Sequence, residues 1–249
     1  MLQYMTELSC YNQFWSVTIT PYDKDIEPNV PDKSDIIRSF CMLSSTLGIN
    51  CVSWRYDPIF LTEKYNIDFH LRSFSRMCAA LEGYTDNCVV SFIDLFPKTK
   101  KNFPNIREVG RHDQEIIVKS FSEIAKDHNI RIMLCCENSG LAVFGADVSG
   151  CMSKNVLERA CGFSLDIPSI SRLMTRHGCN CINGNDIGAY NTCGHGCLYC
   201  YANNDPKTAA ANISLHDPDS PLLTGYPDAG DIIRTAPVEV YKDMQMSWL

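Results

Sequence analysis

Hydrophobic and polar positions in the first half of the chain follow two alternating periods. Short runs rich in β-branched and aromatic residues predict strands at 14–20, 50–60, 88–96 and 130–138. Segments with apolar residues at helical spacing lie between them and predict helices at 34–48, 68–84 and 112–129. Strands that alternate with helices in this way are typical of parallel βα units.

The ends of these segments carry ordinary start and stop signals. Ser34 is a candidate N-cap for the first helix, Gly48 is a candidate stop, and Pro58 is expected to end the second strand. No glycine fingerprint follows any strand, so a Rossmann nucleotide site is not supported. The pattern favours an α/β fold built as a parallel (βα) partial TIM-type barrel, with a doubly wound open sheet as the alternative.

The pattern changes after residue 138, where glycine, asparagine and cysteine dominate. One helix is predicted at 153–162, and the tail from residue 201 onward, rich in proline, aspartate and asparagine, is expected to be irregular. We therefore divide the chain into a (βα) repeat region, 1–138, and an irregular cysteine-rich region with a wrapping tail, 139–249.

Composition narrows the classes of protein. The 249 residues carry a net charge of −7, which argues against a nucleic-acid surface. The one basic cluster, Lys98, Lys100 and Lys101, is interpreted as a solvated loop. No apolar run has membrane-spanning length and no signal peptide is recognised, so a soluble cytoplasmic protein is expected.

Charged residues gather where the predicted strands end. Arg55 and Asp57 close the second strand, Asp94 the third and Glu137 the fourth. The carboxyl ends of parallel strands form the binding face in both candidate architectures, so these side chains are expected to share one mouth. The alternative is that they form structural ion pairs and helix caps.

Fourteen cysteines are many for a chain of this size, and nine of them fall between residues 135 and 200. Cys193, Cys197 and Cys200 lie in one short loop, where Gly194 and Gly196 allow a tight turn. Three thiolates on a four-iron cluster leave one iron free to bind another molecule. A zinc ion with a fourth ligand and a set of buried free thiols are the alternatives.

The spacing C-x3-C-x-aromatic-C, filled by Cys193, Cys197, Tyr199 and Cys200, resembles the cluster motif of the radical S-adenosylmethionine superfamily. The resemblance implies a [4Fe-4S] cluster on the three cysteines, with S-adenosylmethionine on the open iron and Tyr199 near the adenine. It also implies a full or partial (βα) barrel and a 5′-deoxyadenosyl radical. The stretch YCYAN at 199–203 resembles the spore photoproduct lyase branch.

The superfamily motif normally follows the first strand, whereas here it follows the last predicted one. This order resembles a bacterial family called domain of unknown function 1848. The resemblance covers nearly the whole chain, in stretches such as TPYDKDIEPNVPDK at 20–33, WRYDPI at 54–59 and DIGAYNTCGHGCLYCYAN at 186–203. Members of that family usually carry a further N-terminal stretch with at least one more βα unit, which this chain is expected to lack.

The same resemblance singles out a second set of cysteines, whereas Cys136 and Cys161 are interpreted as packing residues. Four thiolates would satisfy a second iron–sulfur cluster or a structural zinc, and unrelated thiols in loops are the alternative. The set comprises Cys135, Cys151, Cys179 and Cys181.

Three hypotheses for function follow. The first is a radical S-adenosylmethionine enzyme that takes electrons from a reductant such as flavodoxin or ferredoxin, with Arg55, Asp57, Asp94 and Glu137 as cofactor or substrate contacts. The second is a non-catalytic iron–sulfur protein for electron transfer or sensing. The third is a binding module stabilised by zinc.

Overall fold

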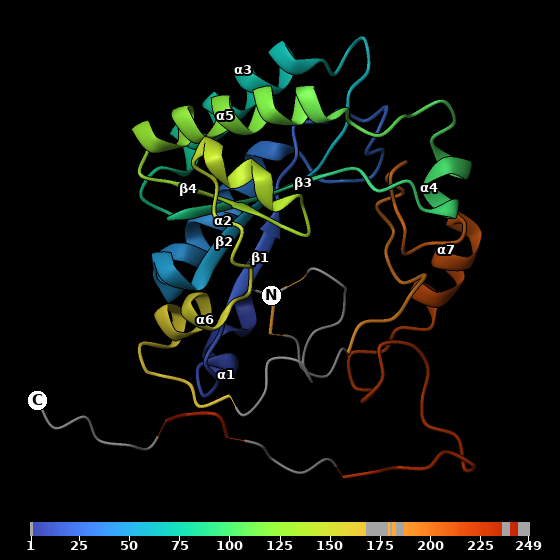
Figure 1. Cartoon of the computed structure of the whole chain (residues 1–249). Coiled ribbons are helices and arrows are strands. Elements are labelled where there is room, and N and C mark those ends of the chain that lie inside the picture. The colour runs from blue at the N-terminus through green and yellow to red at the C-terminus, as the bar shows by residue number, and fades with distance from the viewer. Residues whose placement is uncertain (1, 168–178, 180, 183–186, 236–239, 244–249) are drawn as a thin grey trace, which may run out of the picture.

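A four-stranded parallel sheet forms the centre of the molecule (Figure 1). The computed structural model describes residues 2–167, 179, 181–182, 187–235 and 240–243. The strands follow one another in the sheet in chain order, and all three pairings are parallel. They are β1 (Trp15–Thr18), β2 (Val52–Ile59), β3 (Asn87–Phe92) and β4 (Arg131–Leu134).

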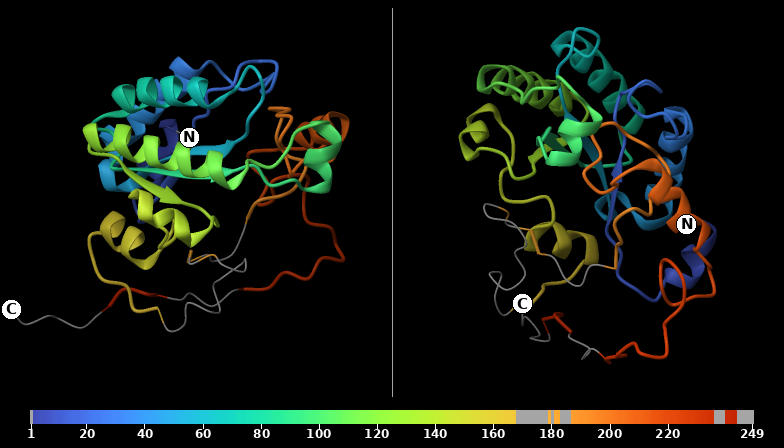
Figure 2. Two further views of the ribbon diagram at one scale, coloured as in Figure 1. Left: turned by 45° about the horizontal axis from the view of Figure 1, so that its top comes forward. Right: turned by 90° about the vertical axis from the view of Figure 1, so that its right-hand side faces the viewer.

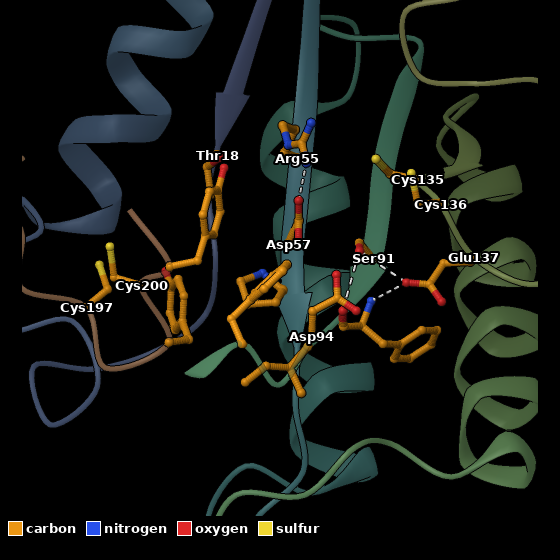
Figure 3. Close-up of a pocket in the computed structure, with 16 residues that line it drawn as sticks. Thr18, Arg55, Asp57, Ser91, Asp94, Cys135, Cys136, Glu137, Cys197 and Cys200 are labelled. Atoms are coloured by element: carbon orange, nitrogen blue, oxygen red, sulfur yellow. Dashed lines mark hydrogen bonds and ion pairs between the residues drawn. The ribbon is translucent and has the colours of Figure 1, made fainter. Parts of the chain in front are cut away.

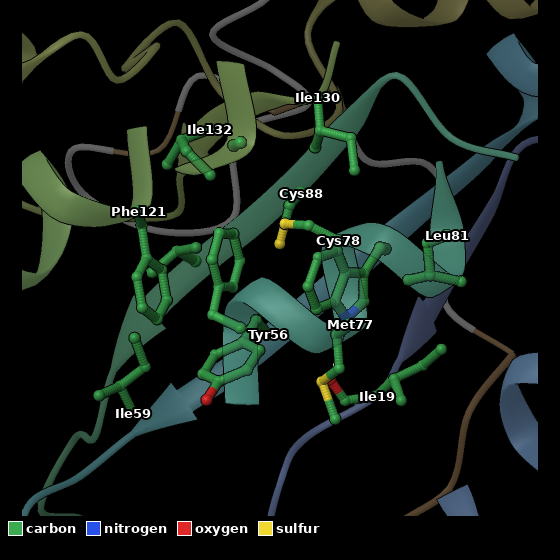
Figure 4. Close-up of a cluster of buried hydrophobic side chains, with 14 of the residues drawn as sticks. Ile19, Tyr56, Ile59, Met77, Cys78, Leu81, Cys88, Phe121, Ile130 and Ile132 are labelled. Carbon is green, nitrogen blue, oxygen red and sulfur yellow. Dashed lines mark hydrogen bonds between the residues drawn. The ribbon is translucent and has the colours of Figure 1, made fainter. Parts of the chain in front are cut away.

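Three long helices cover one face of this sheet: α2 (Lys33–Leu47), α3 (Ile67–Leu81) and α5 (Arg111–Asp127). Right-handed crossovers that add strands in one direction place every helix on the same face. Phe74 of α3 stacks on Phe121 of α5, with ring centroids 3.8 Å apart, and both touch the ring of Tyr56 in β2. These rings belong to the main hydrophobic core (Figure 4).

The predicted boundaries agree with the structure within a few residues. Gly48 ends α2 with a φ of +99°, a conformation that favours glycine. The N-cap of α2 is Asp32 rather than Ser34, and β2 continues through Pro58 to Ile59. Beyond Tyr56 the pairing of β2 with β3 shifts in register, which accommodates a residue that has no N–H to donate.

Shorter elements complete the described chain. Two of them correct the sequence analysis: Lys98, Lys100 and Lys101 lie on a short helix, α4, and the tail contains a helix, α7. These two helices lie near each other at one end of the molecule (Figure 2). The shorter elements are η1 (Leu2–Tyr4), α1 (Met5–Leu8), η2 (Ile49–Cys51), α4 (Pro97–Asn102), η3 (Ser139–Phe144), α6 (Lys154–Cys161) and α7 (Pro206–Ser214).

The α/β class and the parallel strands are confirmed. The sheet made by the described residues is open, and its assignment to part of a TIM-type barrel stays a prediction, as does the boundary at residue 138. Among the described residues, no helix combines the length and the apolar character needed to cross a bilayer.

Candidate metal and cofactor site

A cavity of about 370 Å³ opens at the carboxyl ends of the four strands (Figure 3). Each strand, or the residue directly after it, contributes to its lining: Thr18, Arg55, Ser91 and Cys135. These side chains lie on the face of the sheet that the long helices leave uncovered, because Trp54, Tyr56 and Val90 between them point into the helical core. Successive side chains along each strand therefore point alternately into the cavity and into the helical core.

The cavity brings together residues that the sequence analysis proposed separately. Arg55, Asp57, Asp94 and Glu137 all line it, and so do Cys197, Tyr199 and Cys200 of the cysteine loop. In Figure 3, Cys197 and Cys200 lie on one side of the cavity and Cys135 and Cys136 on the other. Cys193 lines a neighbouring cavity of about 480 Å³, which also reaches Cys197 and Cys200.

Arg55 and Asp57 form an ion pair on β2, and both side chains are mostly buried. Burial by itself would lower the pKa of the Arg55 guanidinium. The charge of Asp57 and its hydrogen bond outweigh the effect of burial, so the pKa of Arg55 is raised. Arg55 is therefore a fixed positive charge in the cavity wall. The peptide bond that follows, Asp57–Pro58, is cis.

Glu137 enters the cavity from the chain that follows β4. Its Oε1 accepts the backbone N–H of Phe92 at 2.8 Å and the hydroxyl of Ser91 at 3.1 Å. Burial raises the pKa of Glu137, although these two donors act against that shift. The carboxyl group is therefore held in one orientation at the end of β3, while Asp94 on the same rim is exposed.

The cysteine loop is attached to the segment between β1 and α2. Asn29 donates its Nδ2 to the carbonyl of Gly194 at 2.9 Å and its backbone N–H to the carbonyl of His195 at 3.1 Å. Leu198 donates its backbone N–H to the carbonyl of Ile26 at 3.0 Å. Gly196 has a φ of +69°, so the turn between these anchors favours a residue without a side chain.

Asn203 fastens the other side of the loop. Its Nδ2 donates to the carbonyl of Cys193 at 2.6 Å, and its backbone N–H points at the Sγ of Cys200 at 3.4 Å. The residue is 8% exposed, and its Oδ1 is buried without a hydrogen-bond partner. A buried amide oxygen without a partner is unusual in a native protein, and because it can only accept, it is open to a hydrogen-bond donor.

Glu27 is a buried carboxylate that the sequence analysis missed. It accepts hydrogen bonds from Thr20 Oγ1 at 2.5 Å, from Lys33 Nζ and from the hydroxyl of Tyr199. Burial, followed by the charge of Glu27, raises the pKa of Tyr199. The ring expected near an adenine is thus fixed at its hydroxyl end. The only signal for Glu27 in the sequence was its place in TPYDKDIEPNVPDK, a stretch that resembles the family.

The second set of cysteines also comes together, on the uncovered face of the sheet. Cys151 Sγ lies 3.8 Å from Cys135 Sγ and 3.4 Å from Cys181 Sγ, and the thiols of Cys181 and Cys179 interact. We call these four residues the β4 thiol group. Cys136 is exposed and lines the cavity, so its interpretation as a packing residue is wrong.

In the described part of the chain, no three His, Cys, Asp or Glu side chains already surround a position for one metal ion. A four-iron cluster does not require this, because each thiolate binds a different iron. Cys193, Cys197 and Cys200 fit such a cluster by their soft sulfur donors and by their position in one turn-rich loop.

The family model described as "Domain of unknown function (DUF1848)" matches residues 1–202. The match covers most of the chain and reaches past all three cysteines of the loop, and the chain belongs to this family. No curated protein and no solved structure gives a significant match.

Proposed function

We propose that the chain is an iron–sulfur protein of the radical S-adenosylmethionine type. Cys193, Cys197 and Cys200 would hold a [4Fe-4S] cluster, and the sheet would be part of a (βα) barrel. One observation carries the proposal: two of these cysteines and Tyr199 line the same cavity as the charged strand ends. The substrate class is left open.

The residues of the chain have distinct roles in this proposal. The cluster, when bound, supplies the electron that cleaves S-adenosylmethionine, and a reductant such as flavodoxin or ferredoxin supplies that electron to the protein. Arg55 offers a fixed positive charge for a carboxylate, and Glu137 offers an oriented carboxyl group for a donor. A volume of about 370 Å³ is within the usual range for small-molecule sites, roughly 300–1,000 Å³.

Electron paramagnetic resonance of the anaerobically reconstituted, reduced protein tests the proposal. We expect a cluster signal that shifts when S-adenosylmethionine is added, because the cofactor binds the open iron. A cluster signal that does not move supports a non-catalytic electron-transfer or sensor protein. A colourless protein that unfolds with a chelator supports a zinc-stabilised binding module.

Cys197→Ala is the matching variant, since Cys197 lies between the two cavities. It should abolish both the shifted signal and the release of 5′-deoxyadenosine. Cys10→Ala is the control, because Cys10 is exposed near the N-terminal helix and far along the chain from the loop. Cofactor cleavage that survives Cys197→Ala with an intact cluster contradicts the assignment of ligands.

A further inference from the structure

The β4 thiol group joins three segments that are distant in the sequence. Cys135 follows β4, Cys151 lies in the turn before α6, and Cys179 and Cys181 come from a later C-x-C. Cys151, Cys179 and Cys181 are buried, and they form a small cluster with hydrophobic side chains of β3 and β4. The β4 thiol group is thus held in place by packing on the uncovered face of the sheet.

The surroundings of these sulfurs suit negatively charged thiolates. The backbone N–H of Met152 points at Cys181 Sγ, 3.3 Å away, and the Arg55 guanidinium interacts electrostatically with Cys135 and Cys151. N–H donors and a nearby cation are the outer contacts that orient metal-bound thiolates and reduce their charge.

The two printed separations between these sulfurs suit a single metal ion better than a four-iron cluster. Four thiolates about 2.3 Å from one zinc ion at tetrahedral angles lie ~3.8 Å from each other. The two contacts of Cys151, 3.4 and 3.8 Å, bracket that separation. Thiolates of a four-iron cluster bind separate irons and lie farther apart than this. A two-iron cluster places two thiolates on each iron, shares the short contacts, and would appear as iron rather than zinc in metal analysis.

We propose that Cys135, Cys151, Cys179 and Cys181 bind one zinc ion as a closed four-thiolate site. As described, the four sulfurs do not yet surround one position. Their contacts run as a chain from Cys135 through Cys151 and Cys181 to Cys179, whose thiol also interacts with Cys136, and zinc would draw the four ligands into a tetrahedron. Binding replaces S–H protons by metal–sulfur bonds and releases those protons.

A zinc ion with four protein ligands has no open position and is structural. Here it would tie the C-x-C segment to the end of β4, where Cys135, Cys136 and Glu137 form one wall of the cavity. The site is separate from the cysteine loop, and the proposal does not depend on the nature of the metal centre at Cys193, Cys197 and Cys200.

Metal analysis of the full chain tests the proposal. The protein is purified with zinc, then reconstituted anaerobically with iron and sulfide, and the two metals are counted separately. We expect about one zinc per chain, lost in Cys151→Ser and Cys181→Ser and kept in the control Cys161→Ser. In Cys197→Ser, zinc should remain while iron falls.

The separate counts distinguish the two proposals. A wild-type protein that holds zinc but gives no iron-dependent signal after reconstitution would contradict the proposed function and leave the zinc site standing. Zinc below about a tenth of an equivalent in the wild type overturns the zinc site. So does a cluster that persists when Cys193, Cys197 and Cys200 are all replaced by alanine.

Alkylation of the wild type keeps the test valid if the serine variants do not fold. Mass mapping after iodoacetamide should find the four thiols protected with zinc and modified once a chelator has removed it, while the exposed Cys10 reacts in both samples. Disulfides among the four cysteines in freshly isolated protein, or equal reactivity with and without zinc, would count against the site.

Discussion

On the helix-covered face of the sheet, Cys78 and Cys88 lie fully buried among aliphatic and aromatic side chains. Burial alone raises the pKa of Cys78 to about 12, so it is a neutral, space-filling thiol. On the opposite face, Cys151 touches two other sulfurs, and Arg55 is close to them. The same residue type thus packs on one face and gathers as candidate ligands on the other, and its neighbours decide which.

The largest expected effect lies on the helix-covered face. Phe121 is fully buried and packs on Phe74 and Tyr56, so Phe121→Ala should lower the free energy of unfolding by about 3–5 kcal/mol. Urea unfolding followed by circular dichroism measures this loss. Metal content per folded molecule should stay unchanged, and Phe121→Leu is the milder control. A loss of metal before any loss of stability would break the division between the two faces.

His70 predicts a pH effect on the same face. It is fully buried, with Nδ1 against the hydroxyl of Tyr56 at 2.8 Å and Nε2 against the carbonyl of Phe60 at 2.9 Å. Burial lowers its pKa from 6.5 to about 4. The unfolded chain therefore takes up this proton first, and the contribution to stability, present above pH 6.5, is lost as the pH falls towards 4.

The expected loss from His70 is on the order of 3 kcal/mol across that interval. His70→Gln is the matched variant, since an amide can donate and accept but does not titrate in this range. Urea midpoints at pH 7.5, 6, 5 and 4 should fall less steeply in the variant than in the wild type. The tyrosines that face His70, Tyr22 and Tyr56, stay neutral throughout, because burial raises the pKa of each. Parallel slopes would show that His70 does not carry the effect.

The smallest expected effect on stability is at the cysteine loop. Asn203→Ala removes the bond to the carbonyl of Cys193 and should cost about 1 kcal/mol in unfolding free energy. The loop would be held less firmly, so a chelator should extract iron from the reconstituted variant several-fold faster than from the wild type. Asn204→Ala, at the exposed neighbouring position, should match the wild type. Equal iron loss from both variants would leave Asn203 with a packing role only.

Most of the fold could be predicted because the strands and helices of the first half carry complete local signals. The third and fourth strands are shorter than predicted, since Asp94 and Glu137 lie where the chain has already left the sheet to line the cavity. Helix α7 was missed although Asp205 caps it and Pro206 occupies its first turn. The overall loop-like composition of the tail concealed these two signals.

The candidate site could be predicted in part. Strand ends converge by geometry, so the shared position of Arg55, Asp57, Asp94 and Glu137 followed from the strand pattern. The roles of Glu27, Asn29 and Asn203 could not be predicted. Each acts through contacts with a distant segment, and a single sequence does not show which polar side chains will be buried together.

The attachment of the cysteine loop has a consequence for biosynthesis. Asn29 and Glu27 bond to partners 165 and 172 residues further along the chain. Contacts between such distant segments form late, because the ribosome must first deliver the second partner and the loop between them must close. The parallel sheet and its helices can be in place before the last cysteines emerge. Insertion of the proposed cluster at the loop would then be a final maturation step on an already folded scaffold.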